Sequence, residues 1–373
     1  MSGEKRKKLV LSDGSEYRGT GFGADKSTVC ELVFNTSPVG YQEILSDPSY
    51  TDQTVVMAYP LIGNYGVNPD DLEADWMSDI RSQSPGSRIG GLVVRDYNDR
   101  PSNFRSKRTL SSLMEEYDIP GISDVDTREL VRRIRDEGSR IACITDADMP
   151  SEEAVRMIKE YPIPHDAVSR VSRKKIQSYK AAEQLFHVAC VDLGMKENII
   201  RSFIGNGCSL TVFPWDAPAD EIRGCRPDGV FFSNGPGDPK DVKCAIDLVR
   251  DIWGEYPMFG ICLGHQIIAL ALGAKTYKLK FGHRGGNHPV RNVMTGRIEM
   301  TSQNHSYAVD GSSLDKTGLY VTHINLLDKT VEGLRSKTEP CFSVQYHPES
   351  APGPSDGSYL FGQFIDMMRQ RKG

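Results

Sequence analysis

One cysteine in this chain lies in a setting that favours nucleophilic chemistry. Cys262 is at the centre of a Gly-x-Cys-x-Gly segment, between Gly260 and Gly264, after the apolar run 258–261 and before the helix-like run 267–272. A strand, a sharp glycine-flanked turn and a helix form a nucleophile elbow, in which a thiol here replaces the more familiar hydroxyl. The free N–H groups at the start of a helix favour the thiolate. Most single cysteines are structural, but these coinciding features favour Cys262 as a nucleophile.

A cysteine nucleophile needs a base, and His347 is the candidate. The stretch 343–345 has the pattern of a strand, so His347 and Glu349 would follow its end. Pro348 restricts the backbone between them and could hold the Glu349 carboxylate against the imidazole as the third group of a triad. A His-Pro-Glu sequence alone more often marks a surface turn. Combined with the cysteine elbow, it indicates a triad of Cys262, His347 and Glu349.

The chemistry of such a triad also requires donors for a negative charge. Attack of a thiolate on an amide carbonyl creates an oxyanion, which preorganised backbone N–H groups stabilise best. The N–H of Leu263, directly after the nucleophile, is one expected donor. The loop at Gly235 and Gly237 follows the neighbouring predicted strand 229–232 and could supply a second donor. Taken alone, Gly-Pro-Gly indicates only a turn.

The other histidines are less informative. His265 lies three residues after Cys262 on the predicted helix, and we expect it to be packed or hydrogen-bonded rather than catalytic. His283, His288 and His305 could form a metal-binding trio, but their spacing matches no compact ligand pattern. We therefore expect no metal site in this chain.

Strands and helices alternate from residue 187 onward, which predicts an α/β domain with a central, mostly parallel sheet covered by helices on both faces. In such sheets ligands bind at the carboxyl ends of the strands, where the loop at 233–239 and the Cys262 elbow are expected. The chain is β-like again after Gly273, and a closing helix is predicted at 359–369. The predicted strands are 187–191, 210–213, 229–232 and 258–261, with helices at 197–204 and 245–253.

Residues 1–145 are predicted to form a β-rich α/β domain, and the charged, proline-containing stretch 146–186 a linker to the domain at 187–373. The first domain would contain a hairpin with an Asp-Gly turn and a helix capped by Asp126. The stretch 40–50 is expected to be a polar loop whose exposed side chains could line a site built elsewhere. The basic run 5–8 is expected to be a solvated edge. Strands are predicted at 9–11, 16–18, 32–34, 54–57 and 91–94.

The composition excludes several classes of protein. With 373 residues the chain is long enough for two domains, and its formal charge of −5 argues against a nucleic-acid partner. We find no apolar run of membrane-spanning length, no signal-peptide pattern and no Gly-x-x-x-x-Gly-Lys phosphate loop. The eight cysteines form no Cys-x-x-Cys pair, so we expect reduced thiols and a cytoplasmic protein.

Three motifs in order resemble the class I, triad-type glutamine amidotransferases. They are Ser-Asn-Gly-Pro-Gly-Asp-Pro at 233–239, Gly-Ile-Cys-Leu-Gly-His-Gln at 260–266 and His-Pro-Glu at 347–349. Within that family, the segments 281–290 and 303–305 look like the small subunit of carbamoyl-phosphate synthase. The stretches 34–37 and 40–50 resemble the N-terminal domain of that subunit, so the match spans nearly the whole chain.

This resemblance implies roles for particular residues. Cys262, His347 and Glu349 would form the catalytic triad. At Ser306 and Tyr307 the family's better-known pattern is Gly-Phe, so the chain departs from it there, which leaves those two assignments open. The residues that would hold L-glutamine are Ser49, Gly235, Gly237, Leu263, Gln266, Asn304, Ser306 and Tyr307.

The resemblance also implies a reaction and a partner. Cys262 would attack the glutamine side-chain amide, and the ammonia released would pass to a large subunit that makes carbamoyl phosphate for arginine and pyrimidine synthesis. ATP and magnesium would be bound by that subunit, and no cofactor by this chain. The two would form a heterodimer, and the number of heterodimers per assembly stays open. Two alternatives are a free-standing cysteine amidase or γ-glutamyl hydrolase, and a regulatory subunit without activity.

Overall fold

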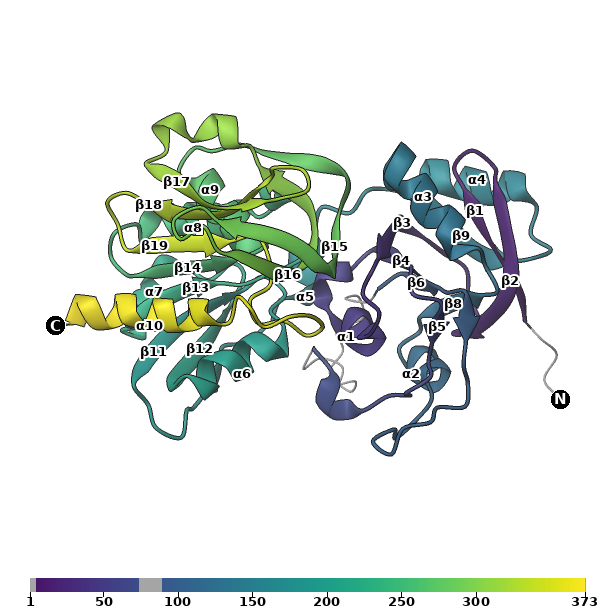
Figure 1. Ribbon diagram of the computed structural model, residues 1–373, viewed down its shortest axis with the longest axis horizontal. Coiled ribbons are helices and arrows are strands. Elements are labelled where there is room, and N and C mark those ends of the chain that lie inside the picture. Colours follow the sequence, from purple (N-terminus) through teal and green to yellow (C-terminus); the bar gives the residue numbers. More distant parts are fainter. Residues whose placement is uncertain (1–4, 74–88, 373) are drawn as a thin grey trace. The chain divides into compact units, whose positions relative to one another are not determined.

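The computed structural model of the chain describes residues 5–73 and 89–372 (Figure 1). Its contacts divide the chain into two compact units, Met1–Pro164 and His165–Gly373. The stretch 146–186, predicted as a linker, is divided between them. It contributes helix α4 (Ser151–Glu160) to the first unit, and helix α5 (Ala167–Val171) and strand β10 (Gln177–Tyr179) to the second.

The first unit is built on a closed barrel of strands with apolar side chains in its core, so the predicted β-rich character is confirmed. The predicted hairpin is present, and the Asp126 carboxylate caps helix α3 by accepting a hydrogen bond from the Glu129 N–H at 3.0 Å. Around the barrel the strands are β1 (Arg6–Leu11), β2 (Glu16–Gly23), β8 (Pro120–Ser123), β6 (Gly91–Val93), β4 (Gln53–Met57), β3 (Thr28–Asn35) and β9 (Arg140–Asp146). The smaller elements are β5 (Leu61–Ile62), β7 (Asp96–Tyr97), η2 (Pro69–Asp71), α2 (Leu110–Glu116) and α3 (Thr127–Glu137).

The prediction of an exposed polar loop at 40–50 is wrong. This stretch forms helix α1 (Tyr41–Ser46) and the 3-10 helix η1 (Pro48–Tyr50), and most of its side chains are buried. Gln42 can be buried because its amide exchanges two hydrogen bonds with the backbone of Asn68. Three side chains on α1 pack in the core of the barrel unit: Tyr41, Ile44 and Leu45.

The basic run at 5–8 is only partly a solvated edge. Residues 6–8 form the first half of β1, and Lys5 and Arg6 are exposed, whereas Lys7 and Lys8 are only 3% exposed. Lys7 Nζ lies 2.9 Å from Asp25 Oδ1, and Lys8 Nζ lies 3.0 Å from Glu16 Oε1. Carboxylates from neighbouring segments thus pair the two ammonium groups where the strand enters the barrel, which is why charge alone mispredicted their exposure.

The second unit is organised around one sheet of ten strands in the described part of the chain. Five neighbouring strands, from β12 to β19 in the order below, run parallel, and the strands beyond β19 pair antiparallel. In sheet order the strands are β10, β12 (Cys208–Pro214), β11 (Phe186–Asp192), β13 (Gly229–Phe232), β14 (Met258–Ile261), β19 (Cys341–Val344), β18 (Val331–Ser336), β17 (Leu319–Asn325), β15 (Thr276–Asn292) and β16 (Ile298–Val309). The predicted central parallel sheet is therefore confirmed, and antiparallel strands extend it on both sides.

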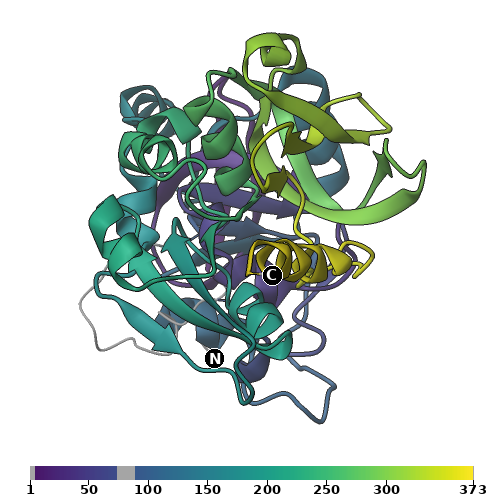
Figure 2. The same ribbon diagram turned by 90° about the vertical axis from the view of Figure 1, so that its left-hand side faces the viewer.

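Helices cover both faces of the parallel part of this sheet (Figure 2). Apolar side chains of α6 (Glu197–Gly205) and α10 (Tyr359–Lys372) form one core cluster with the strands. Those of α7 (Ala219–Gly224), α8 (Lys243–Asp251) and α9 (Leu263–Ala271) form the other. Strands buried on both faces explain the continuous apolar runs in the sequence. The 3-10 helices η4 (Pro239–Asp241) and η5 (Gly311–Lys316) lie in connecting segments.

All helices among residues 5–73 and 89–372 are too short or too polar to cross a lipid bilayer.

Candidate active site

Three adjacent parallel strands bring the predicted site segments to one edge of the sheet. Strand β14 pairs with β13 on one side and with β19 on the other, and Ile261 lies opposite Val344. The carboxyl ends of parallel strands meet at the same edge. The 233–239 loop after β13, Cys262 after β14 and His347 after β19 therefore converge there. In the sequence, 110 positions separate Gly237 of the loop from His347.

Cys262 occupies a strained turn between β14 and α9. Its backbone has φ 52° and ψ −100°, a conformation that residues with a side chain rarely adopt, as expected for a nucleophile elbow. Gly264 allows the turn because helix α9 passes very close to β13. A Cβ atom added there would lie 2.1 Å from the carbonyl oxygen of Phe232, and the Gly264 N–H donates a hydrogen bond to Ser233 O at 3.0 Å.

This close approach makes Gly264 sensitive to substitution. In Gly264→Ala, the methyl group must push α9 away from β13 and move Cys262 with it. We expect a loss of stability of about 1–3 kcal/mol. The kcat/KM of the predicted glutamine hydrolysis should fall about a hundredfold, since displacement of a reacting group by about 1 Å has such effects. Chemical denaturation and steady-state kinetics measure both. Gly362→Ala is the matched control, because Gly362 lies within helix α10 with open space around it, and it should not reduce either quantity.

His347 and Glu349 form a buried pair next to Cys262. His347 Nδ1 lies 2.6 Å from Glu349 Oε1, and the two residues are 2% and 4% exposed. Burial lowers the pKa of His347, but the Glu349 carboxylate and Cys262 outweigh it and raise the pKa well above the ordinary value. The imidazolium is thus stabilised by its carboxylate neighbour, as a triad requires.

The Cys262 thiol and the second ring nitrogen of His347 lie ready for proton transfer without a hydrogen bond between them. The Cys262 thiol donates to the carbonyl oxygen of Asn304 at 3.6 Å. His347 Nε2 is buried and has no hydrogen-bond partner among the described residues, 5–73 and 89–372. Because Cys262 is among the groups that raise the pKa of His347, the two side chains interact. A rotation of the S–H bond would allow the proton to pass from sulfur to Nε2.

Lys196 was missed by the sequence analysis. Its ammonium group lies 3.0 Å from Glu349 Oε1 and donates to the Ser350 carbonyl oxygen at 2.6 Å, and the residue is 2% exposed. Burial raises the pKa of Glu349, but Lys196 and His347 together bring it below its ordinary value. Lys196 therefore helps to keep the carboxylate ionised. A lone lysine between a strand and a helix has no motif, so only the fold identifies this role.

The two segments predicted to supply the oxyanion donors border each other. Leu263 is the first residue of α9, where helix geometry leaves the N–H without an intrahelical acceptor. A Cβ atom added to Gly235 would lie 2.9 Å from the Leu263 side chain, so the loop after β13 borders the first turn of α9. Gly237 has φ 89°, which explains the glycine at that turn.

Four other predicted glutamine-binding residues lie on α9 and β16. Gln266 Nε2 donates to Tyr307 O and to Gln345 Oε1, both at 2.8 Å. Asn304 is 7% exposed, and its carbonyl contacts the Cys262 thiol. The Ser306 hydroxyl accepts a hydrogen bond from Arg284. Asn304 thus contacts the thiol and Tyr307 contacts Gln266 on α9, and the contact of all four residues with a ligand stays a prediction.

Ser49 is placed differently from the other predicted ligands of glutamine. It lies in η1 of the first unit, where its N–H donates to Asp47 Oδ1 at 2.9 Å, and it is 7% exposed. The remaining predicted residues all belong to the second unit. The role of Ser49 in binding glutamine therefore stays a prediction.

His265 is packed and hydrogen-bonded, as predicted. Its Nδ1 lies 2.8 Å from Ser343 Oγ, the residue is fully buried, and burial lowers its pKa to about 3. The unfolded chain therefore takes up a proton near pH 6.5 that the folded protein does not, so stability rises with pH and is lost as pH falls below 6.5.

Replacing His265 should therefore reduce the acid sensitivity of the fold. In His265→Asn, whose amide can still reach Ser343, the slope of unfolding free energy against pH between pH 6 and 4.5 should be smaller by up to about 1.4 kcal/mol per pH unit. Urea denaturation at several pH values measures it. His165→Asn is the control, because His165 is exposed, and it should keep the wild-type slope. An unchanged slope in His265→Asn would show that this histidine is protonated in the fold.

Comparison with known proteins identifies the family. Residues 9–144 match the family model described as carbamoyl-phosphate synthase small chain, CPSase domain, and residues 189–367 match glutamine amidotransferase class-I. The chain is 49% identical over 368 residues to the carbamoyl phosphate synthase small chain of Staphylococcus saprophyticus, covering 99% of this chain and 97% of that protein. The chain belongs to the carbamoyl-phosphate synthase small-chain family.

Other members of this small-chain family are similarly close. The carbamoyl phosphate synthase small chain of Fusobacterium nucleatum is 49% identical, covering 96% of this chain and 97% of that protein. The pyrimidine-specific small chain of Halalkalibacterium halodurans is 48% identical, covering 98% of each. The resemblance inferred from the three sequence motifs is thus confirmed for the whole chain.

Proposed function

We propose that this small chain hydrolyses L-glutamine at Cys262 and delivers the ammonia to the large subunit of carbamoyl-phosphate synthase. The observation that carries this proposal is the arrangement at one edge of the sheet. Adjacent parallel strands present a strained cysteine, a buried histidine–glutamate pair and a glycine loop at the same place. Membership in the family supports the same activity.

In the first half-reaction, Cys262 transfers its proton to His347 and attacks the side-chain carbonyl carbon of glutamine. The N–H groups of Leu263 and Gly235 stabilise the oxyanion that forms. His347 then returns the proton to the leaving nitrogen, so the carbon–nitrogen bond breaks and ammonia departs. A γ-glutamyl thioester on Cys262 remains.

In the second half-reaction, water hydrolyses the thioester. His347 accepts a proton from the water, whose oxygen attacks the carbonyl carbon, and the carbon–sulfur bond breaks as the thiolate leaves. Glutamate is released and the free enzyme is restored. Glu349 holds the imidazole in the orientation that both steps require, and Lys196 keeps Glu349 charged.

Glutamine would be held by groups around this edge. Backbone groups would come from Leu263, Gly235 and Gly237. Gln266 lies on α9 and Asn304 on β16. Ser306 and Tyr307 replace the pair Gly-Phe common in the family. The backbone carbonyl oxygen of Tyr307 accepts a hydrogen bond from Gln266. Because this contact does not involve the side chain of residue 307, it can form with tyrosine in place of phenylalanine. The resemblance to the family also assigns Ser49 a role in binding glutamine.

The ammonia must stay unprotonated to react, because ammonium has no lone pair. A dry passage into the partner would protect it. The large subunit would bind ATP and magnesium, activate bicarbonate and form carbamoyl phosphate for arginine and pyrimidine synthesis in the cytoplasm. The two subunits would form a heterodimer. The family supports this division of labour, since the names of the relatives specify a small chain.

The test is reconstitution with the large subunit. The isolated chain should hydrolyse glutamine slowly and selectively, and the rate should rise when the large subunit and its substrates are added. The complex should make carbamoyl phosphate from glutamine or from ammonium. Fast turnover of varied amides by the isolated chain would instead favour a free-standing cysteine amidase, and no turnover in the complex would favour a regulatory subunit.

A further inference from the structure

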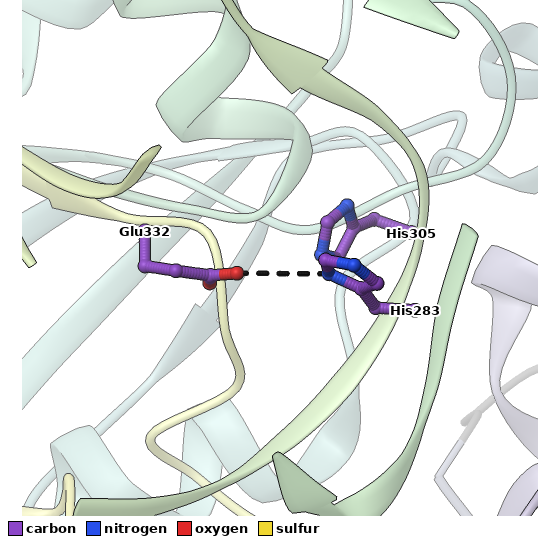
Figure 3. Close-up of side chains that lie close together, drawn as sticks. All are labelled: His283, His305 and Glu332. Atoms are coloured by element: carbon purple, nitrogen blue, oxygen red, sulfur yellow. Dashed lines mark ion pairs between the residues drawn. The ribbon is translucent and has the colours of Figure 1, made fainter. Parts of the chain in front are cut away.

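Three buried side chains that are candidates for binding a metal converge outside the triad. His283 lies on β15, His305 on β16 and Glu332 on β18, and one nitrogen or oxygen atom from each lies within 4.8 Å of the others (Figure 3). The residues are 6%, 5% and 0% exposed. The two imidazole rings meet edge to face, with centroids 4.9 Å apart.

The outer nitrogen of His283 is fixed by a carboxylate. His283 Nε2 lies 2.8 Å from Asp328 Oδ2. Its Nδ1 faces Glu332 Oε1 at 3.6 Å, too far for a hydrogen bond, and has no other hydrogen-bond partner in the described residues. A histidine whose far nitrogen donates to a carboxylate while its near nitrogen points into a polar cluster is the arrangement seen in metal ligands.

His305 has the same arrangement. Its Nδ1 donates to the Tyr307 carbonyl oxygen at 2.7 Å, which leaves the lone pair on Nε2. That nitrogen lies 2.8 Å from Gln303 Oε1. The amide of Gln303 is oriented by its Nε2, which donates to Glu332 Oε2 at 2.9 Å and to Thr301 Oγ1 at 3.1 Å. Two acceptors, Gln303 Oε1 and His305 Nε2, thus face each other, and a cation between them would satisfy both.

We propose that His283 Nδ1, His305 Nε2 and the Glu332 carboxylate bind one divalent transition-metal ion of the zinc class, with Gln303 Oε1 as a further donor. Two imidazoles and a carboxylate suit Zn²⁺ and not Mg²⁺ or Ca²⁺, which prefer oxygen ligands. Donor atoms around tetrahedral zinc lie about 3.3 Å apart, so the widest separation in this cluster, up to 4.8 Å, needs to close by up to about 1.5 Å. This reverses the expectation from sequence that the chain has no metal site.

The site is structural and does not depend on the proposed glutaminase activity. The Tyr307 carbonyl oxygen that accepts from His305 also accepts from Gln266. The ion would therefore lie behind β16, the strand that borders the Cys262 thiol, and would fix the position of that strand. A proton on His283 would compete with the metal ion for the same nitrogen. Burial lowers the pKa of His283, but the carboxylates of Asp328 and Glu332 outweigh burial and raise the pKa to about 9.

Zinc binding to the full chain, alone and with the large subunit, tests the proposal. The protein carries Cys262→Ser so that the Cys262 thiol and His347 cannot bind the metal as a pair. After treatment with a chelator, it is dialysed against buffered Zn²⁺, and bound metal is measured by elemental analysis. We expect one equivalent and a rise in the unfolding temperature. X-ray absorption should show two imidazoles and oxygen around the ion, with no sulfur.

His283→Gln and Glu332→Gln should each weaken zinc binding by at least about tenfold. His323→Gln is the matched control, because His323 is a buried histidine on β17 outside the cluster, and it should bind zinc like the parent. If these variants fold poorly, the absorption spectrum of the parent still decides. Less than stoichiometric binding, sulfur in the coordination shell, or unchanged affinity in both cluster variants would overturn the proposal and favour a protonated His283.

Discussion

Replacing Cys262 with serine should reduce glutamine-dependent synthesis of carbamoyl phosphate by the complex by about 10⁴-fold or more, because loss of a triad nucleophile has effects of this size. The hydroxyl of serine is a much weaker nucleophile than a thiolate at neutral pH. Synthesis from ammonium should remain within about twofold of the wild-type rate, since it bypasses the glutaminase site. Coupled assays with glutamine and with ammonium as separate nitrogen sources measure both rates.

The comparison of the two nitrogen sources makes this prediction specific. Cys225→Ser and Cys244→Ser are suitable controls, because these cysteines are only half-buried and lie away from the triad, and both should retain glutamine-dependent synthesis. If Cys262→Ser lost ammonium-dependent synthesis as well, Cys262 would serve the architecture of the complex rather than the release of ammonia. Retained glutamine-dependent synthesis would exclude Cys262 as the nucleophile.

Replacing Glu349 with glutamine should have two large effects with separate causes. The neutral amide cannot stabilise the His347 imidazolium or impose its orientation, so kcat/KM for glutamine hydrolysis should fall by about 10²–10⁴-fold. The substitution also removes the Glu349 carboxylate from its buried ion pair with Lys196, although the ammonium keeps its contact with Ser350. Breaking a buried ion pair in this way costs about 3–5 kcal/mol of stability. Steady-state kinetics and urea denaturation measure the two effects.

The double variant Lys196→Met, Glu349→Gln separates these causes. Removing both charges of this buried pair avoids leaving one of them behind, so most of the lost stability should return. Activity should stay low, because His347 still lacks its carboxylate. Recovery of activity together with stability would mean that Glu349 acts only by stabilising the fold, and the assignment of a triad would then be wrong.

The central features of the site could be predicted from sequence because they depend on local patterns. An apolar run, two glycines and a helix define the Cys262 elbow, and the backbone at that residue does adopt the strained conformation. Alternating strands and helices predict a parallel sheet, which by itself brings the ends of neighbouring strands together. The convergence of Gly235, Cys262 and His347 follows from that topology.

Long-range contacts between polar side chains could not be predicted in this way. Lys196 reaches Glu349 across 153 residues of sequence, and Glu332 joins His283 and His305 from a third strand. No spacing rule connects such residues, since each depends on the pairing of strands. The burial of Gln42 was missed for a related reason: its amide is satisfied by backbone groups of Asn68 that the sequence does not place beside it.

The proposed function depends most on Cys262 as the residue that attacks glutamine, and labelling with an electrophilic glutamine analogue tests this directly. The complex is treated with the analogue, digested and examined by mass spectrometry, with and without excess glutamine. We predict one label per small chain, on Cys262, with loss of glutamine-dependent synthesis and protection by glutamine. Inactivation accompanied by a label on another residue, such as Cys225 or Cys244, with Cys262 unmodified, would contradict the account.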